Sequence, residues 1–275
     1  MLKSLGSGDV TVIAKQTIKT GMRPNQILNL MSALIIRDLR GRYTRSFLGP
    51  LWSILQPFMM MVVFTMIQGI LGISTGATPY VIFSYVGLLP WTFFTNATRS
   101  SGSSIFGSAS LLKKMAIPRE IFPAIAVLIA LFDLIMSAIV LVGMMIYFQI
   151  PLTINLLWVP LLLLITGALA WGIGLGIAAL GTYRRDFIMG SGFGLQLLTY
   201  ATPIIYPLSD VPEKWLPIYQ LNPMVGLIEN YRTVIIDGMP PNFELLSISL
   251  VMTLVICAIT WPLFRLMSQY FADVL

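Results

Sequence analysis

Long apolar stretches alternate with short polar segments along most of this chain. The longest stretch without a charged residue runs from Ser46 to Thr98 and contains 53 residues. A helix that crosses a bilayer needs about 20 apolar residues, so this stretch is long enough for two crossings. Gly76 and Pro79 divide it, because proline cannot continue a helix. The same reasoning along the chain predicts an all-α integral membrane protein with six spanning helices at residues 51–73, 80–100, 121–148, 152–181, 188–206 and 245–264.

An amphipathic helix is expected before the first of these spans, at residues 25–40. Apolar residues recur there at steps of three and four from Ile27 to Leu39, which places them on one helical face. The segment is too short and too polar to cross a bilayer. We expect it to lie along the cytoplasmic interface with its apolar side in the acyl region. Residues 1–45 are therefore expected to be a cytoplasmic N-terminal segment, and residues 46–275 the transmembrane domain.

The connection at about residues 208–240 is apolar and interrupted by prolines. Its second part begins at Asn222-Pro223, where proline suits the first turn of a helix, and ends at Asp237-Gly238. A helix of that length reaches only about 20 Å and cannot cross. We expect a helical hairpin that dips partway into the membrane from the outer face, sheltered by protein. A flat cap on the outer surface is the alternative.

Composition agrees with a membrane protein and excludes several kinds of chemistry. The chain is 57% hydrophobic and 10% charged, whereas soluble domains carry about 25% charged residues. It has no histidine, which removes histidine-based catalysis and histidine metal sites. Cys257 is its only cysteine, so no intrachain disulfide forms. The phosphate-binding loop Gly-x4-Gly-Lys-Ser/Thr is absent, so we expect no cofactor, metal or ATP in this chain.

The positive charges indicate the orientation of the spans. In the six-span arrangement, 15 of the 17 lysines and arginines fall on one side, the exceptions being Lys214 and Arg232. Cytoplasmic segments carry the excess of positive charge, so both termini are expected in the cytoplasm. The net charge of +6 is then a record of topology and no sign of nucleic-acid binding.

Few residues within the spans suggest chemistry. Asp133 is the only ionisable residue near a span centre, which makes it a functional candidate. We expect it to have no basic partner in the membrane, which leaves two roles open: a proton site in a secondary transporter, or a hydrogen bond to a neighbouring hydroxyl. The glycine patterns at 172–176 and 190–194 are expected to serve close helix packing.

Other residues suggest contacts with a substrate or partner. The arginines at 40, 42 and 45 either anchor the chain on anionic lipid or clamp the phosphate of a lipid-linked substrate. Aromatic side chains either form interfacial belts or line the path of a sugar polymer, whose C–H faces stack on rings. The path candidates are Trp52, Trp91, Phe93, Phe94, Tyr200 and Tyr206. Residues 107–120 are expected to form a short basic helix whose apolar side docks to another protein.

Several segments together resemble one protein family, the permeases of ABC-2-type polysaccharide exporters. The similarity runs in order from about residue 30 to the end of the chain. It rests on residues 37–43, 48–52, 56–57, 87–94, 113–119, 184–186, 202–207, 222–224, 229–232 and 271–273.

The resemblance implies a non-enzymatic half-transporter in the cytoplasmic membrane of a bacterium. Two copies would assemble with two separate ATPase subunits, which bind ATP and Mg²⁺, to export lipid-linked O-antigen, capsular polysaccharide or teichoic acid. The lipid phosphate would pass Arg37, Arg40, Arg42 and Arg45. The ATPase would contact Leu112, Lys113, Lys114, Met115, Ile117, Pro118, Arg119, Glu120, Arg184, Arg185 and Asp186. An exporter of a drug or a small lipid with the same fold is the alternative.

Overall fold

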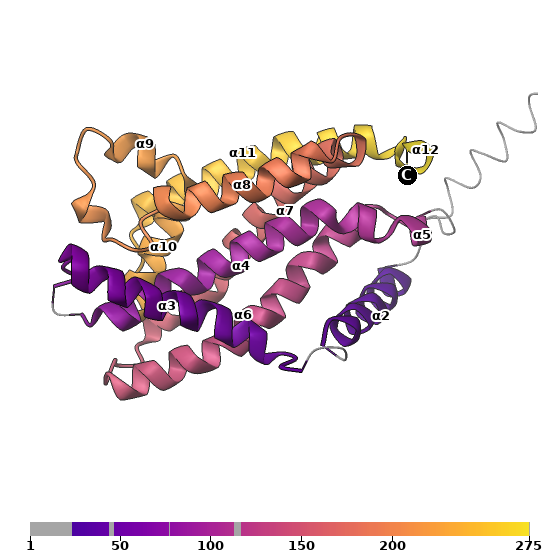
Figure 1. Ribbon diagram of the computed structural model, residues 1–275. Coiled ribbons are helices and arrows are strands. Elements are labelled where there is room, and N and C mark those ends of the chain that lie inside the picture. The colour runs from indigo at the N-terminus through magenta and orange to yellow at the C-terminus, as the bar shows by residue number, and fades with distance from the viewer. Residues whose placement is uncertain (1–23, 44–46, 77, 113–116, 275) are drawn as a thin grey trace, which may run out of the picture.

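The computed structural model describes residues 24–43, 47–76, 78–112 and 117–274, and within these ranges the chain is all-helical (Figure 1). The long elements are α2 (Pro24–Tyr43), α3 (Leu51–Leu71), α4 (Tyr80–Gly107), α6 (Ile121–Tyr147), α7 (Val159–Tyr183), α8 (Asp186–Ala201), α10 (Pro223–Ile235) and α11 (Phe243–Ser268). The short elements are α5 (Ala109–Leu112), η1 (Ile154–Trp158), η2 (Leu208–Asp210), α9 (Leu216–Gln220) and α12 (Phe271–Val274).

Four of the described helices are long and apolar enough to cross a membrane. They are α3, α6, α11 and the continuous segment formed by η1 and α7. The other two expected spans differ from these four in length or polarity. Helix α8 has 16 residues and reaches about 24 Å. Helix α4 is long, but tyrosine, serine, threonine and asparagine are interspersed along it.

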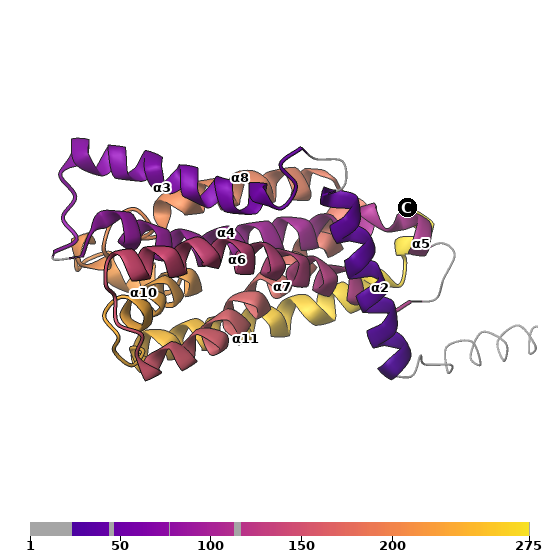
Figure 2. The same ribbon diagram turned by 90° about the horizontal axis from the view of Figure 1, so that it is seen from below.

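The polar side chains of α4 are explained by its central position. It packs against α3, α6, α7, α8 and α10 (Figures 1 and 2). Its polar groups therefore find partners on neighbouring helices: the Tyr85 hydroxyl donates to the Ser137 carbonyl at 3.1 Å, and Ser101 donates to the Pro123 carbonyl at 2.9 Å. Because its surface faces protein, α4 does not need the hydropathy of a helix that faces lipid.

Glycines allow α7 to approach its neighbours closely. A Cβ atom on Gly172 would lie 2.7 Å from the Cys257 sulfur, and one on Gly174 would collide with Ser101. Close helix packing is also expected at the glycines of α8, but it is not found within this chain. Positions 190, 192 and 194 have no atom within 4 Å of where a Cβ would stand. The reason is that α8 lies at the edge of the bundle, with Leu195 as its one buried residue among those described.

Helix α2, expected at residues 25–40, is present and lies across one end of the bundle (Figure 2). Its apolar side packs on the bundle through Leu34, which is buried in a cluster with Ile121, Phe122 and Ile125. The helix expected at residues 107–120 does not match the structure over its whole length. Helix α5 is only four residues long, Lys113, Lys114 and Met115 lie outside the described residues, and residues 117–120 are not helical.

The proline-rich connection forms α9 and α10 at the end of the bundle opposite α2 and α5 (Figure 1). Helix α10 begins where the Asn222 side chain accepts a hydrogen bond from the Met224 amide at 3.1 Å, as a capping residue does. Eleven of its 13 residues are buried. Arg232, itself buried, donates to the Pro203 and Ile204 carbonyls at 2.8 Å each and thereby fastens α10 to the segment after α8.

Candidate functional site

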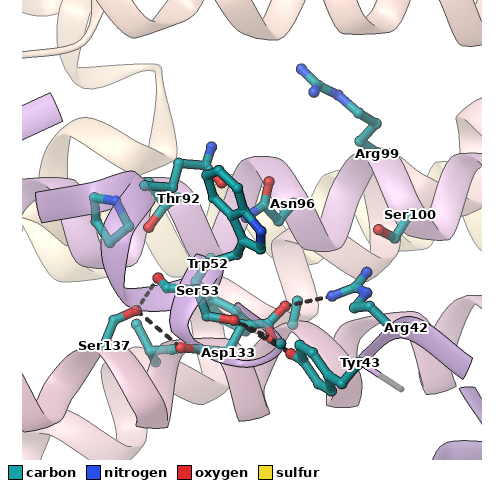
Figure 3. A pocket seen from close by; sticks show the side chains of 16 residues that line it. Arg42, Tyr43, Trp52, Ser53, Thr92, Asn96, Arg99, Ser100, Asp133 and Ser137 are labelled. Atoms are coloured by element: carbon teal, nitrogen blue, oxygen red, sulfur yellow. Dashed lines mark hydrogen bonds and ion pairs between the residues drawn. The ribbon is translucent and has the colours of Figure 1, made fainter. Parts of the chain in front are cut away.

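A polar cavity of about 280 Å³ lies where α2 and α3 meet the central helix α4 and α6 (Figure 3). Its lining is unusual for an apolar bundle, because charged, amide and hydroxyl side chains outnumber aliphatic ones. They are Arg42, Tyr43, Ser53, Gln56, Thr92, Asn96, Arg99, Ser100, Asp133 and Ser137, and the indole of Trp52 also lines the cavity.

One side of the cavity is organised around Asp133. Arg42 contacts one carboxylate oxygen at 2.6 Å. The other oxygen accepts hydrogen bonds from the Tyr43 hydroxyl and, at 2.8 Å, from the Ser53 hydroxyl. The Ser137 hydroxyl lies one turn along α6 and donates to the Ser53 carbonyl at 2.6 Å. These bonds connect α2, α3 and α6 through side chains.

The expectation that Asp133 has no basic partner is therefore wrong, whereas the expected hydroxyl contacts are confirmed. Arg42 lies 91 residues away in the sequence, on the helix that crosses the end of the bundle. Only 13% of the Asp133 side chain is exposed, so its charge needs compensating partners. Burial, together with the hydrogen bond to Asp133, raises the pKa of Tyr43, which keeps its phenol a donor.

The other side of the cavity carries polar groups that have no partner in the part of the chain described. They are the amides of Gln56 and Asn96 and the guanidinium group of Arg99. In Figure 3, Trp52 lies beside Asn96, and Arg99 extends from α4 away from Asp133. Sequence reasoning overlooked Arg99, although its position directly after the longest charge-free stretch was an available signal.

The arginines expected near a lipid phosphate occupy different surroundings. Arg37 pairs with its neighbour Asp38 at 2.7 Å and lines a second cavity of about 240 Å³. That cavity shares Arg42 and Ser100 with the first one, so the two adjoin. Arg40 is exposed on α2, and Arg45 lies outside the described residues.

The aromatic candidates divide into buried and exposed groups. Trp91, Phe93 and Phe94 are each at most 3% exposed, and the Trp91 indole donates to the Thr199 hydroxyl at 3.1 Å, joining α4 to α8. Trp52 and Tyr200 are exposed, and Tyr206 is half-buried beside Tyr219. The structure does not bring these six side chains together along one surface of the single chain.

Among the residues expected to meet an ATPase, those that the structure describes gather at the end of the bundle near α5. Glu120 pairs with Arg265 of α11 at 3.1 Å, and the guanidinium group of Arg185 lies over the Phe106 ring at 5.1 Å. Arg184 and Asp186 are exposed at the turn between α7 and α8. Leu112, Pro118 and Arg119 are partly or fully exposed, whereas Ile117 is buried in the cluster that also holds Leu34.

Four described helices that are long and apolar enough to cross a membrane indicate a membrane protein, and comparison with known proteins gives the family. The family of ABC-2 type transporters matches residues 29–236. The chain belongs to this family.

Curated relatives align over nearly the full chain. The O-antigen export system permease protein RfbA of Klebsiella pneumoniae is 26% identical over 94% of this chain and 100% of its own length. The protein of the same name from Myxococcus xanthus is 29% identical over 90% of this chain and 96% of its own length. The polysialic acid transport protein KpsM of Escherichia coli is 26% identical over 86% of this chain and 92% of its own length.

Proposed function

We propose that this chain is the membrane subunit of an ATP-driven exporter that moves a lipid-linked polysaccharide outward across the cytoplasmic membrane of a bacterium. The observation that carries the proposal is the near end-to-end alignment with relatives named for O-antigen and polysialic acid transport. The cargo of both named classes is a glycan, which favours a polymer over a drug or a small lipid. The ion pair of Asp133 with Arg42 gives that carboxylate a structural role, which argues against a proton-coupled carrier.

The proposed topology has six spans, formed by α3, α4, α6, α7 with η1, α8 and α11. Both termini are cytoplasmic, because that arrangement collects 15 of the 17 cations on one side. The segment with α9 and α10 then lies on the outer side. Since α10 is buried and too short to cross, we take it as the half of a hairpin that dips into the membrane and is sheltered by protein.

The proposed assembly is two copies of this chain with two ATP-binding subunits that hold ATP and Mg²⁺. Exposed apolar side chains on α8, such as Met189, Phe193 and Leu197, together with the open glycine positions, support a second copy beside α8. The polar end of the bundle near α5 supports docking of the ATPase. It collects charged groups from three parts of the chain, including Glu120, Arg185 and Arg265.

The lipid phosphate is proposed to enter beside α2. Arg37 and Arg42 line the second polar cavity, which adjoins the first, and guanidinium groups match phosphate oxygens in pairs. A lipid that slides along the interfacial helix would bring its phosphate past these arginines to the adjoining first cavity while its acyl chain stays in the bilayer.

The proposed function is tested in a strain that lacks this gene, with its neighbouring ATPase and glycosyltransferases intact. We expect the polysaccharide to disappear from the cell surface and to accumulate inside on its lipid carrier, and a plasmid copy to restore it. ATP-dependent uptake of the lipid-linked polymer by inverted membrane vesicles is the direct measurement. Normal surface polymer in the deletion strain, with no intracellular accumulation, would overturn the proposal.

A further inference from the structure

The cavity at the α2 end contains a set of ligand-binding groups that the bundle itself does not use. Gln56, Asn96 and Arg99 line it without a partner in the described parts of the chain. Gln56 and Arg99 are exposed and Asn96 is partly exposed, so their polar atoms are open to a ligand. Three such groups from α3 and α4 that line one cavity indicate a site for a polar ligand.

The charged side chains that line the cavity indicate the sign of the ligand's charge. Asp133 is held by Arg42 at 2.6 Å and by two hydroxyl groups, so each of these two charges is already compensated. Arg99 remains and gives the cavity one net positive charge. It extends from α4 on the side away from Asp133, where its guanidinium fork faces no carboxylate of the lining (Figure 3). A monoanionic phosphate or carboxylate group is the matching partner.

The neutral groups specify the rest of the ligand. Gln56 and Asn96 each offer a donor and an acceptor, the combination that suits neighbouring hydroxyl groups. Trp52 is 54% exposed and lies beside Asn96, so its ring has a free face that suits the C–H side of a sugar. The volume of about 280 Å³ is near the lower limit of ordinary small-ligand sites and admits one sugar unit with its charged group.

We propose that the cavity lined by Trp52, Asn96 and Arg99 binds an anionic sugar unit, with Arg99 as the residue that recognises the charge. This inference rests on the proposed function and deepens it. The anionic group has two possible sources, the phosphate that joins the first sugar to its lipid and a carboxylate on an acidic sugar within the polymer. Both present one negative charge beside a hydroxylated ring.

The test is calorimetric binding to the full-length chain in lipid nanodiscs. The probes are N-acetylglucosamine 1-phosphate, an α2,8-linked oligosialic acid, a neutral malto-oligosaccharide and inorganic phosphate. We expect an anionic sugar to bind more tightly than the last two, because it satisfies both Arg99 and the amides. Arg99→Gln should weaken that binding by about tenfold or more, as expected for the loss of a charge-assisted hydrogen bond.

Matched variants separate this site from general charge and aromatic effects. Lys214→Gln removes one positive charge from an exposed side chain outside the cavity, and Trp215→Ala removes an exposed indole on the same segment. Neither should change affinity, whereas Trp52→Ala should lower it. A loss confined to the sugar phosphate identifies the lipid-linked end as the source, and a loss confined to oligosialic acid identifies the acidic polymer.

Two results would overturn the site. One is wild-type affinity in Arg99→Gln for both anionic sugars, and the other is inorganic phosphate binding as tightly as the sugar phosphate. The assay needs no ATPase and no transport, so its outcome is independent of the export test. A chain that restores surface polymer but binds neither anionic sugar refutes the site and leaves the exporter function standing. A chain that binds them through Arg99 without restoring polymer refutes the exporter function alone.

Discussion

Asp133 and Arg42 join two segments that lie 91 residues apart in the sequence. The carboxylate lies inside the bundle, whereas Arg42 is 45% exposed at the end of α2. The carboxylate is therefore the partner that depends on the pair, because an exposed arginine is well solvated without it. Because of this asymmetry, we assign Asp133 the role of attaching α2 to the bundle. In that role it also helps to position the polar cavity, which α2 lines.

We predict that a double-mutant cycle on these two residues gives a favourable coupling energy of about 1 kcal/mol, discounted for the exposure of Arg42. Arg42→Gln should lower thermal stability more than Asp133→Asn, because it leaves a buried carboxylate without a cation. The measurement is thermal unfolding in detergent. Arg37→Gln is the control, since the exposed Arg37 and Asp38 pair with each other on one helix and with no other ionised side chain in the described ranges. Fully additive effects would contradict the attachment role.

At the scale of the elements, small residues determine how near α7 comes to the helices on its two sides. Gly174 faces Ser101 of α4, and Gly172 and Gly176 face Cys257 and Thr260 of α11. Backbones can approach this closely only where no side chain intervenes. The glycine pattern on α8 looks the same in sequence, yet it faces open space in the single chain. The spacing of glycines therefore identifies a close-packing face without identifying what packs there.

Gly174→Ala is expected to destabilise the chain by about 1–3 kcal/mol, because the new methyl group collides with Ser101 and forces α4 and α7 apart. Gly143→Ala is the matched control: it lies within α6 and has nothing within 4 Å of the added Cβ. It should keep or slightly raise stability, since alanine favours helix over glycine. Thermal unfolding of both variants in one detergent is the measurement, and equal shifts would contradict close packing at Gly174.

At the scale of the whole molecule, the apolar helices differ in how much of their surface the rest of the chain covers. Helix α8 has a single buried residue among those described and exposes Met189, Phe193, Leu197 and Tyr200. Helix α6 also exposes apolar side chains, such as Ile139, but 10 of its 27 residues are buried in the core. A helix with so little support from its own chain is the best candidate for a contact with a second copy.

Phe193→Gln should therefore weaken the association of two copies, whereas Ile139→Gln should not. The two side chains are matched, being 64% and 60% exposed on apolar helices. Counting photobleaching steps of labelled chains in nanodiscs at low protein density measures the number of copies. We expect two steps for the wild type and for Ile139→Gln, and mostly one step for Phe193→Gln. Equal step counts for both variants would place the contact elsewhere.

The sequence by itself determined the features that depend on local composition. Apolar length predicts where α3, α6, α11 and the continuous segment of η1 and α7 begin and end within a few residues, because a bilayer selects continuous apolar segments of one length. The same holds for the amphipathic α2, whose pattern repeats with the helical period. Helix α10 begins at its expected cap, Asn222, and ends at Ile235, two residues before the expected stop at Asp237-Gly238.

Only the tertiary structure decided which side chains meet. The ion pair of Asp133, the burial of Trp91, Phe93 and Phe94, and the place of Arg99 in the cavity lining all depend on how helices far apart in sequence pack together. Periodicity gives each helix an apolar face but does not name the neighbour that covers it. For that reason the charge of Arg42 could be predicted near the membrane surface, whereas its partner and the cavity beside it could not.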